Sequence, residues 1–116
     1  MTEIPTDRPG TANSIAGEFR GLISSGRLIA GERMPPVRQV ARDVGVAVGT
    51  AARAYRQLEE EGIIVTRRGG GTRVSESAHP LPAEVLESIR QLDARAHAAG
   101  IGIEPVITAL RAMARS

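Results

Sequence analysis

Apolar residues recur at intervals of three and four along the first half of the chain, a spacing typical of helices that bury one face. The pattern predicts three helices, over residues 11–25, 36–44 and 48–61. A glycine stands at the end of each, and glycine is common where helices end; these glycines are Gly26, Gly45 and Gly62. The expected inner faces are formed by Ile15, Phe19, Leu22 and Ile23, by Val37, Val40, Ala41 and Val44, and by Ala51, Ala54, Tyr55 and Leu58.

The pattern changes after the third helix. Residues 63–68 are rich in β-branched side chains, which favours a strand, and residues 72–75 predict a second strand. The run Gly69-Gly70-Gly71 between them predicts the tip of a β-hairpin with arginines beside it. The segment Arg33-Met34 is a candidate third strand. The order helix, helix, turn, helix, hairpin is that of a winged helix-turn-helix.

The remainder of the chain has its own organisation. Residues 75–82 are polar and contain prolines, which is typical of a hinge. Beyond them, apolar residues alternate by four and three, as in a helix that packs on another helix; they are Val85, Ile89, Leu92, Ala96 and Ala99. Gly100 and Gly102 interrupt this helix. A last amphipathic helix carries Ile103, Val106, Ile107, Leu110 and Met113.

These elements predict a mainly α fold with a small β-hairpin wing. We expect a flexible N-terminal arm over residues 1–10, a winged helix-turn-helix domain over residues 11–76, a hinge over residues 77–82, and a two-helix C-terminal tail over residues 83–116.

The composition excludes several classes of protein. Of the 116 residues, 41% are hydrophobic and 24% charged, as in ordinary globular domains. No apolar stretch approaches the roughly 18 residues of a transmembrane helix, and residues 1–10 do not resemble a signal peptide. The absence of cysteine excludes disulfides and thiolate metal sites. We therefore expect a cytoplasmic protein without membrane association.

Charge is more informative in its distribution than in its total. The net charge is +2, and every basic residue is an arginine. Residues 1–79 hold eleven arginines against nine acidic residues, whereas residues 80–116 hold four of each. Arginine suits phosphate and guanine recognition, although a coding bias of the source genome explains the preference for arginine equally well.

Catalytic chemistry has little support. His79 and His97 show no metal-ligand spacing and are expected at the surface. The run Glu59-Glu60-Glu61 is more typical of a solvated helix end than of paired catalytic carboxylates. The glycine run lacks the Gly-Lys-Ser/Thr ending of a phosphate-binding loop. We expect no enzyme activity, no metal and no cofactor.

A DNA-binding function fits the same elements. A helix fits the major groove with its N-terminal residues facing base edges, and arginines on a hairpin are suited to phosphates or the minor groove. The candidate DNA-binding residues are Arg38, Ala47, Val48, Gly49, Thr50, Arg53, Arg56, Arg67, Arg68, Gly69, Gly70 and Arg73. Each arginine alone is better explained as a solvated surface charge; the combination favours DNA.

A family signature covers about residues 11–76. It consists of Gly26-Arg27-Leu28, Gly31-Glu32-Arg33-Met34-Pro35-Pro36-Val37-Arg38, Ala41-Arg42, Gly45-Val46, Thr50, Ala54-Tyr55, Leu58-Glu59, Glu61-Gly62 and Gly69 to Val74. This set resembles the GntR family of winged helix-turn-helix regulators. The resemblance implies that DNA is read through Arg38, the start of the third helix and Gly69.

The chain departs from this signature at the start of the third helix. Many members carry polar residues where this sequence has Ala47-Val48-Gly49. We therefore expect base specificity to depend on Arg38, Thr50 and Arg53, with methyl contacts from Val48.

The short tail resembles that of the YtrA subfamily, which implies a role in dimerisation. The residues expected at the dimer interface are Val85, Ile89, Leu92, Ala96, Ile103, Ile107 and Leu110. The alternative is that the first tail helix packs on its own winged domain.

The sequence thus predicts a sequence-specific transcription regulator, a repressor that binds double-stranded DNA at an inverted-repeat operator as a homodimer. A small-molecule effector, if one exists, cannot be identified from the residues. The alternative is a protein-interaction module that uses the winged domain, and the acidic end of the third helix and the low net charge are compatible with it.

Overall fold

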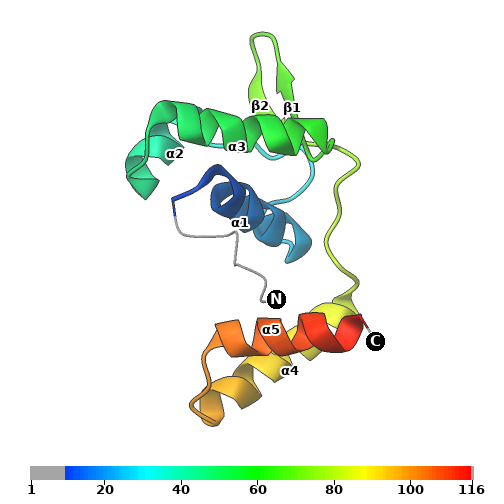
Figure 1. Cartoon of the computed structure of the whole chain (residues 1–116). Helices are drawn as coiled ribbons and strands as arrows, with labels where there is room; N and C mark the ends of the chain where they lie inside the picture. Colours follow the sequence, from blue (N-terminus) through cyan, green and yellow to red (C-terminus); the bar gives the residue numbers. More distant parts are fainter. Residues whose placement is uncertain (1–9, 116) are drawn as a thin grey trace. The chain divides into compact units, whose positions relative to one another are not determined.

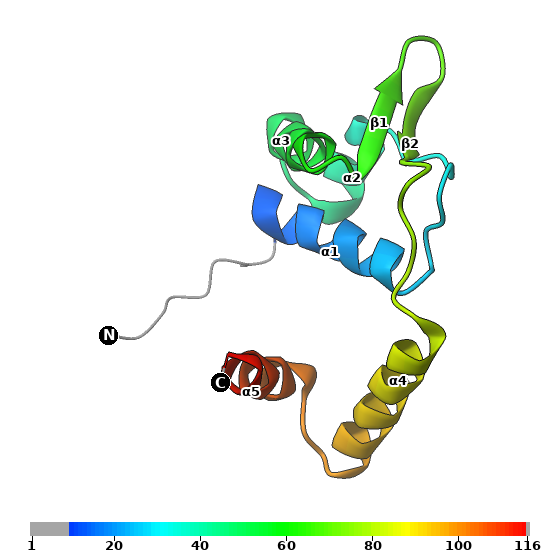
Figure 2. The same ribbon diagram turned by 90° about the vertical axis from the view of Figure 1, so that its right-hand side faces the viewer.

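The computed structural model describes residues 10–115 of the chain, which divide into two compact units at Pro80 and Leu81 (Figures 1 and 2). The predicted N-terminal arm lies outside the described residues, apart from Gly10.

The first unit contains three helices, α1 (Ala12–Ser24), α2 (Val37–Val44) and α3 (Val48–Glu60). Their limits agree with the predicted helices to within one residue. Thr11 begins α1 because its hydroxyl accepts a 3.0 Å hydrogen bond from the Ser14 amide, and the Ser14 side chain accepts one in return from the Thr11 amide. Gly45 ends α2 at a φ of +81°, which glycine adopts without strain. This turn allows α3 to begin three residues later.

Two short antiparallel strands follow α3 and project from the helices as a hairpin (Figure 1). Strand β1 (Ile64–Arg67) pairs with β2 (Gly71–Val74), from Ile64 opposite Val74 to Arg67 opposite Gly71. The suspected third strand is reduced to one bridge between Arg33 and Arg73. Two backbone bonds flank this bridge, from the Met34 amide to Thr72 at 2.7 Å and from the Val74 amide to Glu32 at 2.8 Å.

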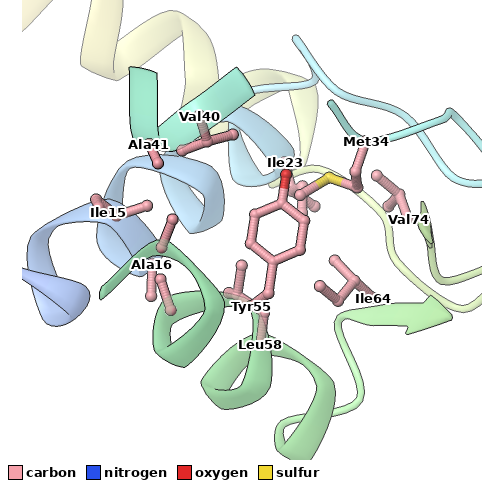
Figure 3. Close-up of a cluster of buried hydrophobic side chains, with 12 residues drawn as sticks. Ile15, Ala16, Ile23, Met34, Val40, Ala41, Tyr55, Leu58, Ile64 and Val74 are labelled. Carbon is pink, nitrogen blue, oxygen red and sulfur yellow. The ribbon is translucent and has the colours of Figure 1, made fainter. Parts of the chain in front are cut away.

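One hydrophobic core joins the helices to the base of the hairpin (Figure 3). Most of the predicted inner-face residues lie in it, together with Met34, Ile64 and Val74. The prediction is wrong for Val44, which is 43% exposed. The chain turns at Gly45 immediately after it, so Val46 packs against the core instead. The buried set is Ile15, Ala16, Ile23, Met34, Val40, Ala41, Ala51, Ala54, Tyr55, Leu58, Ile64 and Val74.

The second unit is a pair of helices, α4 (Ala83–Ala98) and α5 (Ile103–Ala114), which contact each other. The amide of Ile101 donates a hydrogen bond to the carbonyl oxygen of Ala96, which closes the turn after α4. The elements confirm the predicted fold class, a mainly helical chain with a two-stranded wing and a two-helix tail. Within residues 10–115, no helix has the length and apolar content needed to cross a membrane.

Candidate nucleic-acid interface

The burial pattern of α3 determines which of its residues face solvent. Ala51, Ala54, Tyr55 and Leu58 are buried on one side. At about 100° per residue, Gly49, Arg53 and Arg56 fall on the opposite side, and all three are exposed. Three of the five predicted DNA-contacting residues of this helix therefore share one outer face, whereas Val48 and Thr50 lie to either side of it.

The N-terminal end of α3 has no side-chain cap. Ala47 is the N-cap in extended conformation, and it has no hydroxyl or carboxylate to accept a hydrogen bond from the first turn. Val48 is 48% exposed, and Thr50 is half-buried. The Arg53 Nη2 atom lies 3.5 Å from the Thr50 hydroxyl, at the limit of a hydrogen bond. Uncapped amides at a helix start favour an anionic group such as phosphate.

Arg38 occupies the second position of α2 and is exposed. Helix α2 packs on α3, with the turn from Gly45 to Ala47 joining the C-terminal end of one helix to the start of the other. Arg38 and the start of α3 therefore belong to one helix pair, but they are at opposite ends of α2. A ligand that contacts both must be extended.

The wing contributes a second group of candidates. Arg67 and Arg68 are exposed, whereas Arg73 is partly buried and donates a 3.1 Å hydrogen bond from Nη1 to the carbonyl oxygen of Gly31. Gly69 has a φ of +77°, and the Gly70 amide donates to the Arg67 carbonyl oxygen at 3.0 Å, which closes the tip. Arg73 thus supports the wing in addition to carrying charge.

Arg33 is a candidate contact that was not predicted from the sequence. Its side chain is exposed, and its backbone forms the β-bridge with Arg73. A Cβ atom added at Gly71 would lie 3.0 Å from the Arg33 Nη2 atom. Its guanidinium therefore lies beside the hairpin. The suspected strand at Arg33-Met34 was the only signal for this placement. We call Arg33, Arg67, Arg68 and Arg73 the wing arginines.

Tyr55 fixes the position of α3. Its hydroxyl donates a hydrogen bond to the Pro35 carbonyl oxygen, and its ring meets that of Phe19 edge-on, with centroids 5.7 Å apart. Burial raises the pKa of Tyr55 to about 12, because the phenolate is poorly solvated there. The phenol is therefore neutral over the physiological pH range and acts as a structural donor.

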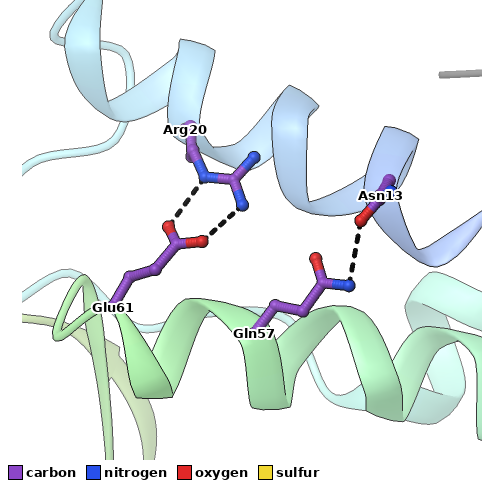
Figure 4. Close-up of polar contacts among 4 residues, drawn as sticks. All are labelled: Asn13, Arg20, Gln57 and Glu61. Atoms are coloured by element: carbon purple, nitrogen blue, oxygen red, sulfur yellow. Dashed lines mark hydrogen bonds and ion pairs between the residues drawn. The ribbon is translucent and has the colours of Figure 1, made fainter. Parts of the chain in front are cut away.

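Two polar contacts join α1 to α3 at the surface (Figure 4). Arg20 binds Glu61 through two hydrogen bonds of 2.8 and 2.6 Å, and Gln57 donates a 3.0 Å bond to Asn13. The hydrogen bond from Arg20, with its charge, lowers the pKa of Glu61. One carboxylate of the acidic run is thus neutralised by a partner, while Glu59 and Glu60 are exposed.

None of the candidate arginines forms an ion pair within the described residues. Among residues 10–115 the ion pairs are Arg20–Glu61 and Arg90–Glu87. The first is used between helices and the second lies on α4. The arginines of α2, those on the outer face of α3 and the wing arginines therefore carry positive charge without an ion-pair partner, which suits a polyanion.

The predicted interface residues of the tail differ in how exposed they are. Ala96 is buried and Ile107 half-buried, whereas the other five are exposed; these are Val85, Ile89, Leu92, Ile103 and Leu110. His79 and His97 are exposed, and the described part of the chain holds no cluster of side chains suited to a metal ion.

A protein-family model matches residues 11–74, and its description is "Bacterial regulatory proteins, gntR family". The chain is also 36% identical over 95 residues to the HTH-type transcriptional repressor YtrA of Bacillus subtilis, an alignment that covers 78% of this chain and 73% of that protein. It spans only 17% and 25% of the length of two further regulators that it matches.

Solved structures show the same fold. A GntR family transcriptional regulator from Listeria monocytogenes is 28% identical with a TM-score of 0.56, covering 93% of this chain and 97% of that one. YtrA from Sulfolobus acidocaldarius, a GntR-family transcription factor, is 27% identical with a TM-score of 0.55, covering 84% of this chain and 90% of that one.

Proposed function

The chain belongs to the GntR family of bacterial regulatory proteins, which makes it a DNA-binding transcription regulator rather than an enzyme, and we propose that it is a repressor that binds an inverted-repeat operator as a homodimer. The observation that carries the proposal is the outer face of α3, where Gly49, Arg53 and Arg56 are exposed together beside an uncapped helix start.

We assign base recognition to α3 and to Arg38 on α2. A recognition helix enters the major groove with its first turn against the bases, and arginine is the side chain best suited to guanine. The contacting residues proposed are Arg38, Ala47, Val48, Gly49, Thr50, Arg53 and Arg56. All of them except the half-buried Thr50 are exposed, and the three arginines have no acidic partner within the described residues, which supports this assignment.

The wing is proposed to hold the phosphate backbone. Arg67, Arg68 and Arg73 flank the glycine tip formed by Gly69 and Gly70, and a narrow hairpin with a small tip is suited to a groove edge. Arg33 is added to this group because its guanidinium lies beside Gly71. Such contacts supply affinity and position more than sequence discrimination.

The tail, residues 83–116, is proposed as the dimerisation element, joined to the DNA-binding domain of residues 11–76 by the hinge of residues 77–82. Of the twelve exposed large hydrophobic residues in the described chain, eight lie from Leu81 onward. Two short helices bury too little surface to be stable with such a surface in water. A second copy of the pair covers it with two-fold symmetry and spaces two α3 helices about one turn of DNA apart.

The repressor role is proposed from similarity to a relative. The Bacillus subtilis relative is named a transcriptional repressor, and a dimer seated on an operator blocks access to the DNA beneath it. Because the target is chromosomal DNA, we place the protein in the cytoplasm.

Selection from a randomised duplex pool with the full-length chain tests this function. We expect the bound duplexes to share an inverted repeat and to bind more tightly than unrelated DNA at the same salt concentration. Placing the selected duplex over a promoter should then reduce transcription in vitro when the protein is added. Equal binding to all duplexes would contradict the proposal of a specific operator.

A further inference from the structure

Val48 is an exposed apolar side chain at the start of the proposed recognition helix. It is the first residue of α3, it is about half exposed, and it is absent from the residues that pack in or against the core. Its neighbours Ala47 and Gly49 are exposed as well. Within the described residues, nothing in the fold accounts for a branched hydrocarbon at this position.

Gly49 is equally unexplained by the fold. It has an ordinary helical backbone, and a Cβ added there would meet nothing within 4 Å. Glycine favours a helix less than alanine does, so the fold itself gives no reason for glycine in the first turn of α3. A partner that approaches the α3 backbone closely would require the space that glycine leaves.

The surroundings of Val48 indicate what that partner is. Arg53 and Arg56 lie further along α3, and neither has an ion-pair partner among residues 10–115. This charge is complementary to nucleic acid. The bases of the major groove present polar edges and one apolar group, the C5-methyl group of thymine.

We propose that Val48 contacts the C5-methyl group of a thymine in each half of the operator and so determines base specificity at that position. Ala47 and Gly49 keep the flanking positions small enough for this contact. This inference rests on the proposed DNA-binding function and adds to it a base and the residue that recognises it.

The test uses the duplex selected from a randomised pool by the full-length chain. Each thymine in turn is replaced by uracil, which lacks the methyl group and keeps the base pair, and affinity is measured by fluorescence anisotropy. At one thymine per half-site we expect about fourfold weaker binding, the value of one methyl group removed from water. Val48→Ala should bind the thymine duplex more weakly and should no longer distinguish thymine from uracil.

Val44→Ala is the matched control, since Val44 is a comparably exposed valine at the end of α2. It should keep the preference for thymine. Gly49→Ala should unfold at a higher temperature than the parent chain and bind the duplex more weakly, a combination that a structural role for the glycine does not produce. Thermal melting of each variant confirms that it is folded.

Three outcomes would contradict the inference about Val48 and leave the proposed DNA-binding function unaffected. These are equal affinity for thymine and uracil at every position, a preference that persists in Val48→Ala, or a preference lost equally in Val44→Ala. Failure of the chain to bind any duplex specifically overturns both the inference and the proposed function.

Discussion

The hydroxyl of Tyr55 donates a hydrogen bond to the carbonyl oxygen of Pro35, and this contact joins the middle of α3 to the residue that precedes the N-cap of α2. The same ring packs edge-on against Phe19 of α1. One side chain therefore fixes the proposed recognition helix against both of the other helices of its domain.

The titration of Tyr55 tests this placement, because it is the only tyrosine of the chain. Burial raises its pKa from 10.0 to about 12. The raised value means that the contribution to stability is complete below pH 10 and is lost as the pH rises toward 12. Phenolate absorbance of the native protein should rise with a midpoint near 12, and near 10 in denaturant. A native midpoint near 10 would show that the ring is solvated.

Tyr55→Phe gives a second measure of the same contact. We expect the free energy of unfolding at neutral pH to fall by about 0.5–1.5 kcal/mol, because the hydrogen bond to Pro35 is lost. The variant should also lose the alkaline decline in stability that the parent shows. An unchanged decline would assign it to another group.

The ion pair between Arg20 and Glu61 should contribute less. Both side chains are about 40% exposed, so the pair is screened by water, and Glu61→Gln should cost under about 1 kcal/mol at neutral pH. The pKa of Glu61 is lowered from 4.5, so this contribution is present above pH 4.5 and is lost as the pH falls below it. Urea unfolding at neutral and acid pH measures the difference.

Arg27→Gln is the control for that experiment, because Arg27 is an exposed arginine with no ion pair among the described residues. Its stability difference from the parent should not depend on pH. If Glu61→Gln behaves in the same way, the ion pair makes no contribution in solution.

Local signals in the sequence were sufficient for the helices. Gly26, Gly45 and Gly62 mark the ends of α1, α2 and α3 because each adopts a positive φ that other residues disfavour. Hydrophobic spacing identified most of the core. It failed at Val44, because helical periodicity does not show that the chain turns immediately afterwards and that Val46 takes the inner position.

Contacts between residues that are far apart in the sequence could not be predicted from local patterns. Arg20 and Glu61 are 41 positions apart, and Tyr55 and Pro35 are 20 apart. Nothing in local spacing pairs them, since the pairing depends on how the helices cross. The position of Arg33 beside Gly71 has the same origin, because it requires the bridge between Arg33 and Arg73.

The wing should contribute mainly electrostatic affinity. Arg67→Gln with Arg68→Gln should reduce the slope of log affinity against log salt by about one to two units per bound subunit, since each phosphate contact contributes about 0.9. The matched control, Arg27→Gln with Arg95→Gln, removes the same charge outside the proposed interface. Equal slopes for the wing variant and the parent would show that the wing does not contact DNA.

The tail should determine the oligomeric state. Leu92→Glu places a charge among the exposed apolar residues of α4, and we expect a monomer by light scattering where the parent is a dimer. Ala94→Glu is the control, because Ala94 falls on the opposite side of α4 and is exposed. A chain lacking residues 80–116 should also be monomeric. Dimers in both altered chains would place the interface outside the tail.

The most direct test of specific DNA recognition is the affinity of Arg38→Ala for the selected operator duplex, measured beside an unrelated duplex at the same salt concentration. We expect binding to the operator to weaken by about 1–3 kcal/mol, the value of a bidentate guanine contact, with little change on unrelated DNA. Arg27→Ala removes one exposed arginine elsewhere in the domain and should bind like the parent. Operator affinity that is unchanged in a folded Arg38→Ala variant would contradict the proposed mode of recognition.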